Sequence, residues 1–208
     1  MKAAALILTA GRSRRMGQPK AWLRLNGETL LERLVRETRR GGCATVVVVA
    51  GADTDRSLAS RVEIGERLTG SAEALADGIA IVIGCPDKQP IDSIRAGLAH
   101  IPANHAVLLW PIDHPFADAE LVARLVRALG EESNRIAVPT AGGKRGHPIL
   151  MSPDVAHELL TPAADDGARD VVRRDPGRVV TVDAADPRVL WSLNTPDEAR
   201  ALGIEPGD

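Results

Sequence analysis

The chain has 208 residues, of which 44% are hydrophobic and 26% charged, and this is enough material for one globular core. We expect a single domain over residues 1–208. A formal net charge of −2 gives no general attraction to nucleic acid or to an anionic membrane, so any binding of phosphate groups has to be local.

No targeting or membrane segment is recognisable. The apolar runs are far shorter than the roughly 20 residues of a spanning helix, and residues 3–10 are followed by arginines instead of a cleavage site. The cysteines, Cys43 and Cys85, have no metal-ligand spacing, which fits a reducing compartment. We therefore expect a soluble, cytoplasmic protein with neither nucleic acid nor membrane as a partner.

Short aliphatic runs alternate with segments of helical period, which predicts an α/β fold with a doubly wound, mainly parallel sheet. In chain order, strands are expected at 3–9, 45–49, 79–83, 105–110 and 135–138, and helices at 28–40, 57–67, from Pro90, and at 119–129. Beyond that point the pattern loosens into a flexible basic loop at 141–146, short elements at 165–174, 178–182 and 189–191, and a final helix begun by Thr195-Pro196. This irregular final third is where we expect acceptor specificity.

The loop after the first strand carries the strongest chemical signal. Its glycines and serine let backbone N–H groups converge on an anion, and Arg15 and Lys20 supply charged donors to phosphate oxygens. The loop matches neither a Walker A motif nor a dinucleotide fingerprint. We interpret it as a cradle for a triphosphate, the alternative being a solvated basic turn.

Residues 8–20, Leu-Thr-Ala-Gly-Arg-Ser-Arg-Arg-Met-Gly-Gln-Pro-Lys, resemble the signature L-x-A-G-x-S-x-R-M-G-x-x-K of the molybdenum-cofactor nucleotidyltransferases, and in particular the cytidylyltransferases. That family belongs to the Rossmann-like nucleotide-diphospho-sugar transferase superfamily. Later segments resemble its D-x-P-F, G-H-P, G-A-R and D-T-P-x-D motifs; they are residues 113–116, 146–148, 167–169 and 194–197.

The resemblance implies a magnesium-dependent transfer of a nucleoside monophosphate from an NTP to a phosphorylated acceptor, with release of pyrophosphate. The residues that it implies for the nucleotide are Thr9, Ala10, Gly11, Ser13, Arg15 and Lys20, and those for the acceptor are Gly146, His147, Pro148 and Arg169. Arg15, Lys20 and Asp113 would be catalytic, and Asp113 and Asn194 would hold the metal.

Asp113 also has a physical reason to bind magnesium, because a carboxylate at the carboxyl end of a strand can hold a hard cation that bridges phosphate oxygens. The alternative is a turn or N-cap aspartate. A zinc site at His114 and His147 is not expected, since no third ligand has suitable spacing.

The chain departs from the family at Ser192-Leu193-Asn194, where the pattern usually reads D-I-D. An amide oxygen can ligate magnesium but brings no charge. Two interpretations of Asn194 stay open, a weakened metal ligand and a helix N-cap ahead of Pro196. A catalytically weak nucleotide-binding or cofactor-handling protein would tolerate the change.

Ala10-Gly11 resembles the cytidylyl branch of the family, so CTP with molybdopterin is the favoured pair, and GTP or a sugar phosphate are the alternatives. The resemblance also implies a molybdoenzyme or its chaperone as a partner. A nicotinamide-dependent oxidoreductase of similar α/β organisation is a further alternative, although the glycine fingerprint is absent.

Overall fold

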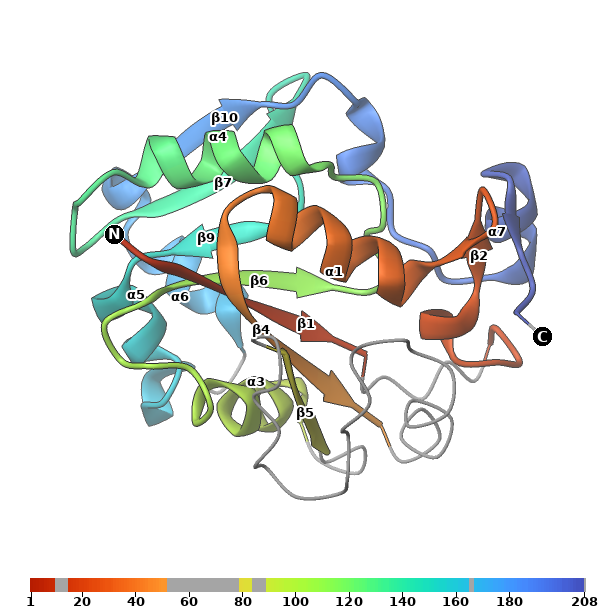
Figure 1. The fold of residues 1–208 in the computed structure, drawn as a ribbon. Helices are drawn as coiled ribbons and strands as arrows, with labels where there is room; N and C mark the ends of the chain where they lie inside the picture. Colours follow the sequence, from red (N-terminus) through yellow and green to blue (C-terminus); the bar gives the residue numbers. More distant parts are fainter. Residues whose placement is uncertain (10–14, 52–78, 84–88, 165–166, 208) are drawn as a thin grey trace.

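The structure is a computed structural model that describes residues 1–9, 15–51, 79–83, 89–164 and 167–207 (Figure 1). The strands of the main sheet lie in the order β10-β7-β9-β6-β1-β4-β5, with β8 paired to β7. Only β8 and β9 run antiparallel to their neighbours. The main sheet consists of β1 (Ala3–Leu8), β4 (Cys43–Ala50), β5 (Ile79–Ile83), β6 (Ala106–Pro111), β7 (Ile136–Ala141), β8 (Lys144–Arg145), β9 (Ile149–Met151) and β10 (Val179–Asp183).

Helices cover both faces of this sheet, and the alternation of side chains along β1 divides the core in two. Ala3, Ala5 and Ile7 pack under α1 and α4, whereas Ala4 and Leu6 pack under α3, α5 and α6. The helices are α1 (Leu30–Arg40), α3 (Pro90–Leu98), α4 (Ala119–Leu129), α5 (Pro153–Glu158), α6 (Ala168–Arg174) and α7 (Pro196–Ala201). The 3₁₀ turns are η1 (Lys20–Trp22), η2 (Pro162–Ala164), η3 (Pro176–Arg178) and η4 (Pro187–Leu190).

The carboxyl ends of the parallel strands meet at one edge of the sheet, which lies to the right in Figure 1. A small second sheet and α7 lie beyond this edge. The second sheet pairs β2 (Arg24–Leu25) with β3 (Glu28–Thr29) and with β11 (Ile204–Glu205), so it joins the segment after the first loop to the C-terminal segment.

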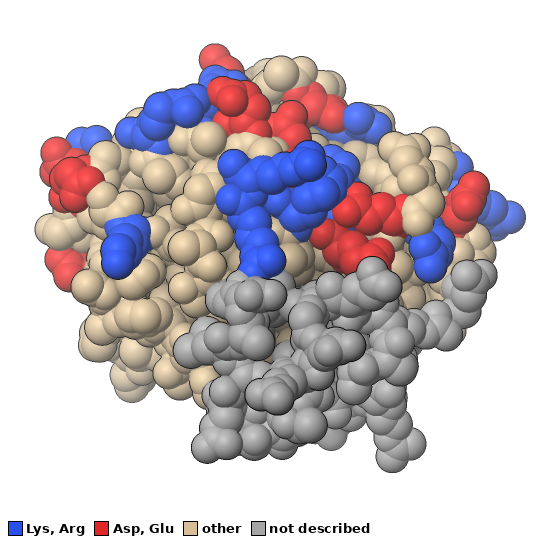
Figure 2. Space-filling model, in the orientation of Figure 1, with Lys and Arg blue, Asp and Glu red and all other residues tan. Residues whose placement is uncertain are grey.

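Lys and Arg side chains gather at the centre of the face shown in Figure 2, over α1. Two of the α1 arginines are held in place by polar contacts. Arg33 donates to the carbonyl oxygens of Pro115 and Ala117, at 2.9 and 3.4 Å, and Arg36 pairs with Glu37 at 2.7 Å. The buried Glu37 in turn accepts the N–H of Ala119 at 2.8 Å. These contacts fix the segment that follows Asp113.

The fold class predicted from the sequence is confirmed, and so are most of the predicted strands and helices. Two predictions are wrong. Residues 28–29 form β3, and α1 starts only at Leu30 because Thr29 and Glu32 make a capping box. The expected flexible loop at 141–146 is a tight hairpin, in which Gly142 and Gly143 take φ values of 54° and 75° between β7 and β8.

Helix α5 was not expected from the sequence, and neither were β9 and the strands of the small sheet, which have only two or three residues. The helix predicted at 57–67 lies outside the described residues. In the part of the chain that the structure describes, no helix has the length and apolar character needed to cross a membrane.

Candidate active site

The first loop connects β1 to η1, and it is described from Arg15 onward. Ala10, Gly11 and Ser13 lie outside the described residues. Thr9 is buried, and its N–H and hydroxyl both donate to the carbonyl of Val49, at 2.9 and 3.1 Å, so this side chain joins the ends of β1 and β4. Met16 is packed in the core while Arg15 is exposed. Thr9 and Met16, which are both buried, therefore anchor the chain before and after residues 10–14.

Lys20 opens η1 and is half-buried at the carboxyl edge of the sheet. Burial lowers the pKa of its ammonium group, and the field of Arg15 acts in the same direction, whereas Asp113 and Glu198 oppose the shift. The backbone carbonyl of Lys20 accepts the N–H of Leu23 at 3.2 Å, but its side chain makes no hydrogen bond or ion pair with another described residue. An ammonium group has three N–H donors, which suit the oxygens of a phosphate group.

Asp113 and Asn194, the two predicted metal ligands, are brought together by Ser192. The Ser192 hydroxyl donates to Asp113 Oδ2 at 2.9 Å and accepts the Asn194 side-chain N–H at 3.1 Å. A backbone bond of 2.8 Å, from Leu193 N to the Asp113 carbonyl, fixes the two segments side by side. The side-chain nitrogen of Asn194 faces Ser192, and no described residue donates a hydrogen bond to its Oδ1.

The N-cap interpretation of Asn194 is wrong, because Thr195 caps α7. The Thr195 hydroxyl accepts the N–H of Glu198, and the Glu198 carboxylate accepts the backbone N–H groups of Thr195 and Asn194, at 2.9 and 2.7 Å. Asn194 precedes the cap and is engaged through its backbone. Its side chain is left for the Asp113 and Ser192 cluster.

The donor set fits magnesium. Asp113 offers a carboxylate, and Ser192 and Asn194 offer neutral oxygens at the same place. Magnesium in phosphate-transferring sites is usually held by one or two carboxylates together with substrate phosphates. Within the described ranges there is no cluster of three or more His, Cys, Asp or Glu side chains that would hold a metal without the substrate.

Lys20 follows β1, and Asp113 follows β6, the strand beside it. From β1 the chain proceeds to β4 and β5 on one side, and then crosses back to β6 on the other. Such a reversal leaves a crevice outside the carboxyl ends of the two central strands, where α/β proteins bind ligands. Lys20 and Asp113 flank that point.

The predicted acceptor loop lies close to the Asp113 cluster. His147 donates its backbone N–H to the Val189 carbonyl at 3.2 Å, and its ring lies 4.4 Å from that of His114, the residue after Asp113. The peptide bond between His147 and Pro148 is cis. The structure thus brings Gly146, His147 and Pro148 toward the residues expected to hold the metal.

Both imidazoles are kept neutral near pH 7. Burial lowers the pKa of His147 to about 4, with further lowering by His114 and Arg169 and opposition from Asp113. Burial also lowers the pKa of His114, against the raising influence of Asp113. Arg169 itself is exposed in the first turn of α6, so its guanidinium acts on this loop from the solvent side.

Gly146 is a position where a side chain does not fit. A Cβ there would lie 2.6 Å from the backbone oxygen of Val189. We expect Gly146→Ala to lower the free energy of unfolding by about 1–3 kcal/mol, since the backbone of η4 has to move away. Urea denaturation measures this, and the exposed Lys144→Ala in the same hairpin is the control, with a change of at most about 0.5 kcal/mol. Equal stabilities of the two variants would argue against this close approach.

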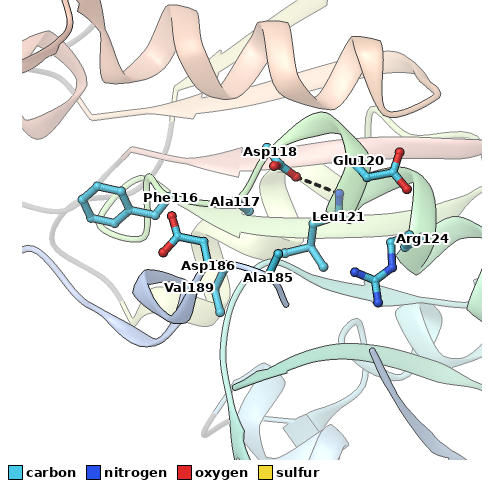
Figure 3. A pocket seen from close by; sticks show the side chains of 9 residues that line it. All are labelled: Phe116, Ala117, Asp118, Glu120, Leu121, Arg124, Ala185, Asp186 and Val189. Carbon is cyan, nitrogen blue, oxygen red and sulfur yellow. Dashed lines mark hydrogen bonds between the residues drawn. The ribbon is translucent and has the colours of Figure 1, made fainter. Parts of the chain in front are cut away.

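A pocket lies beside the site but does not contain it. Figure 3 shows it between the start of α4 and the segment before η4, and the Asp118 carboxylate in it caps α4 by accepting the N–H of Leu121 at 2.8 Å. It is lined by Phe116, Ala117, Asp118, Glu120, Leu121, Arg124, Ala185, Asp186 and Val189. None of the predicted catalytic residues borders it.

Sequence reasoning missed the roles of Ser192 and His114. Ser192 was noticed only as a departure from the family pattern, although a hydroxyl two residues before Asn194 was the available signal. His114 was considered only as a zinc ligand. Its packing against His147 depends on a contact between residues 33 positions apart, which the sequence pattern does not indicate.

Three known proteins are similar to this chain in sequence or in fold. A molybdenum cofactor guanylyltransferase of Rhizobium rhizogenes is 33% identical over 92% of this chain and 87% of its own. A nicotine blue oxidoreductase of Paenarthrobacter nicotinovorans is 27% identical over 95% and 94%. A solved nucleotidyl transferase from Methanothermobacter thermautotroptrophicus has the same fold, with a TM-score of 0.73 at 20% identity over 97% and 95% of the two chains.

The family model of the MobA-like NTP transferase domain matches residues 5–179, a span that runs from β1 through the acceptor loop to the start of β10. This span contains Lys20, Asp113 and His147. The expectation of a nucleotidyltransferase is confirmed by this match and by the relative that is one-third identical. The chain belongs to the MobA-like family of NTP transferases.

Proposed function

We propose that this protein transfers a nucleoside monophosphate from an NTP to the phosphate group of molybdopterin. The observation that carries the proposal is that Lys20, which follows β1, lies within electrostatic reach of Asp113, which follows the neighbouring β6 and is bonded into the cluster with Ser192 and Asn194. The name of the Rhizobium relative supports molybdopterin as the acceptor.

The reaction is an in-line displacement at the α-phosphorus of the NTP. An oxygen of the acceptor phosphate forms the new P–O bond, the bond between the α-phosphorus and the bridging oxygen breaks, and pyrophosphate leaves with that electron pair. A phosphate monoester has a second pKa near 6 and is mostly a dianion at neutral pH, so no general base is needed. This agrees with neutral histidines beside the site.

Lys20 binds phosphate oxygens, and because it is half-buried its charge is screened less than that of a surface lysine. Asp113 and Asn194 would hold a magnesium ion, which when bound neutralises charge on the phosphates. Ser192 orients both residues through its hydroxyl. Arg15, exposed at the start of the described part of the loop, is a further donor to the triphosphate.

Two observations bear on the nucleotide and disagree. The CTP prediction depends on Ala10, which lies outside the described residues, whereas relatives at 30–35% identity are named guanylyltransferases. We give the relatives more weight, because their similarity extends along most of the chain, and propose GTP. Titrations of CTP and GTP with magnesium decide the point, and a tenfold preference for CTP, about 1.4 kcal/mol, restores the first prediction.

The experiment for the proposed reaction is a screen of the four NTPs against molybdopterin and a sugar phosphate, with pyrophosphate release as the readout. We expect release only with molybdopterin. An oxidoreductase is the second candidate, favoured by the name of the Paenarthrobacter relative. Oxidation of NADH or NADPH without any pyrophosphate release would replace our proposal by that one.

We expect Asn194→Asp to lower the magnesium concentration for half-maximal activity by several-fold, because it replaces a neutral oxygen ligand with a charged one. Thr195 keeps its cap in this variant, so stability is not the readout. Asn104→Asp, an exposed change just before β6, is the control and should leave the magnesium titration unaltered. If Asn194→Asp leaves the magnesium concentration for half-maximal activity unchanged, Asn194 is not a metal ligand.

A further inference from the structure

Trp191 is the one tryptophan of three that is open to solvent. Its side chain is 46% exposed, whereas Trp22 and Trp110 are 6% and 0% exposed. Large aromatic side chains gain free energy when they are covered, and an exposed one at the edge of a polar site is suited to a ligand ring.

The position of Trp191 links the two parts of the site. The next residue, Ser192, bonds Asp113. Two residues earlier, the Val189 carbonyl accepts the N–H of His147 in the acceptor loop. A molecule whose phosphate reaches Asp113 and whose body lies along the acceptor loop therefore passes Trp191.

The ring of Trp191 packs against Phe116, which in turn contacts Arg188. Phe116 is buried and meets it edge to face, with centroids 6.2 Å apart and ring planes at 82°. The guanidinium of Arg188 lies over the Phe116 ring, 4.7 Å from its centroid, and is itself fixed by Asp186 at 2.7 Å. This support reduces the entropy that the indole loses when a ligand stacks on it.

Trp191 belongs to the segment that contacts the predicted acceptor loop. This segment is bonded to Asp113, which follows β6, and to His147 in the loop after β8, whereas the residues predicted for the nucleotide follow β1. A ring that stacks on Trp191 therefore belongs to the acceptor and not to the nucleotide.

We propose that Trp191 is the stacking surface for the planar heterocycle of the acceptor, the pterin ring in the reaction proposed above. The inference rests on that proposed function for the identity of the ring. It makes Trp191 a specificity-determining residue, which favours a phosphorylated aromatic acceptor over a sugar phosphate.

The test compares wild type with Trp191→Ala and Trp191→Phe. Binding of 6-carboxypterin to the full chain is measured by calorimetry, and the acceptor KM is measured by pyrophosphate release. Stacking of a ring on an aromatic side chain corresponds to a change of about fivefold to 150-fold in affinity. We expect Trp191→Ala to weaken pterin binding and raise the acceptor KM by at least about fivefold at nearly unchanged kcat, with Trp191→Phe close to wild type.

The matched control is Leu160→Ala, which truncates the other exposed large hydrophobic residue of the described chain, at 45% exposure. Leu160 follows α5, at the end of the molecule away from the site (Figure 1). This variant should bind the pterin as wild type does. Melting temperatures of all variants show whether each is folded.

The two proposals fail in different ways. Pyrophosphate release with an acceptor KM that Trp191→Ala leaves unchanged overturns the role of Trp191 and keeps the reaction. Pterin binding that depends on Trp191 without pyrophosphate release keeps the stacking surface and overturns the reaction. A wild type that binds no 6-carboxypterin, or a Trp191→Ala variant that loses nucleotide affinity instead, also overturns the stacking proposal.

Discussion

Lys20→Ala is expected to lower kcat by about 10²–10³ while the protein stays folded. The charge that Lys20 supplies acts on phosphates whose charge is redistributed in the transition state, and losing one preorganised donor of this kind typically costs two to three orders of magnitude. The lysine opens a short 3₁₀ turn, and its side chain makes no hydrogen bond with another described residue, so the change in stability should be small. Pyrophosphate release under saturating substrates measures kcat.

Lys2→Ala is the matched control, since Lys2 is exposed at the opposite end of β1 and its side chain faces solvent. It should keep wild-type turnover. Lys20→Arg restores the charge but not the shape of the donor, and should recover part of the activity. Full turnover by Lys20→Ala would place the phosphate-binding site elsewhere in the chain.

Asp113→Asn is expected to be at least as damaging, with a loss of about 10³ in kcat and of the magnesium dependence at millimolar concentrations. The substitution removes the only carboxylate in the Asp113, Ser192 and Asn194 cluster, and a hard cation binds weakly to neutral oxygens alone. The amide oxygen of the new side chain can still accept the hydroxyl of Ser192, so the segment before α7 should keep its position. A magnesium titration of activity, with melting curves, separates metal loss from unfolding.

The control for that variant is Asp154→Asn, which changes an exposed aspartate in the first turn of α5. Its magnesium titration should superimpose on that of wild type. If Asp113→Asn needs the same magnesium concentration for half-maximal activity as wild type, groups other than Asp113 bind the metal.

The fold could be predicted from the sequence because its central strands are apolar runs without alternation and its helices have clear apolar stripes. Residues 106–110 of β6 and 46–50 of β4 are buried on both faces, as the continuous hydrophobic pattern predicts. The short strands could not be found this way. Two or three residues, as in Ile149–Met151, contain no measurable period, and their strand conformation comes from pairing with β6 and β7.

The site could be predicted in part for a similar reason. Lys20 and Asp113 each follow a strand that the sequence identifies, and parallel strands place their carboxyl ends together. Asn194 was found through the family pattern, but its two interpretations were separated only by the capping bonds of Thr195 and Glu198. Trp191 and Ser192 depend on the path of the irregular segment after β10, which tertiary contacts determine.

The central claim is that the residues after β1 and β6, Lys20 and Asp113 among them, join a nucleotide to a phosphorylated acceptor. The most direct measurement is mass spectrometry of a reaction containing the protein, GTP, magnesium and molybdopterin, with pyrophosphate quantified in the same sample. We predict one pyrophosphate released for each molybdopterin–guanosine dinucleotide formed, and neither product with Asp113→Asn. Release of pyrophosphate or phosphate without a covalent nucleotide–acceptor product, or a conjugate formed equally well by Asp113→Asn, would contradict it.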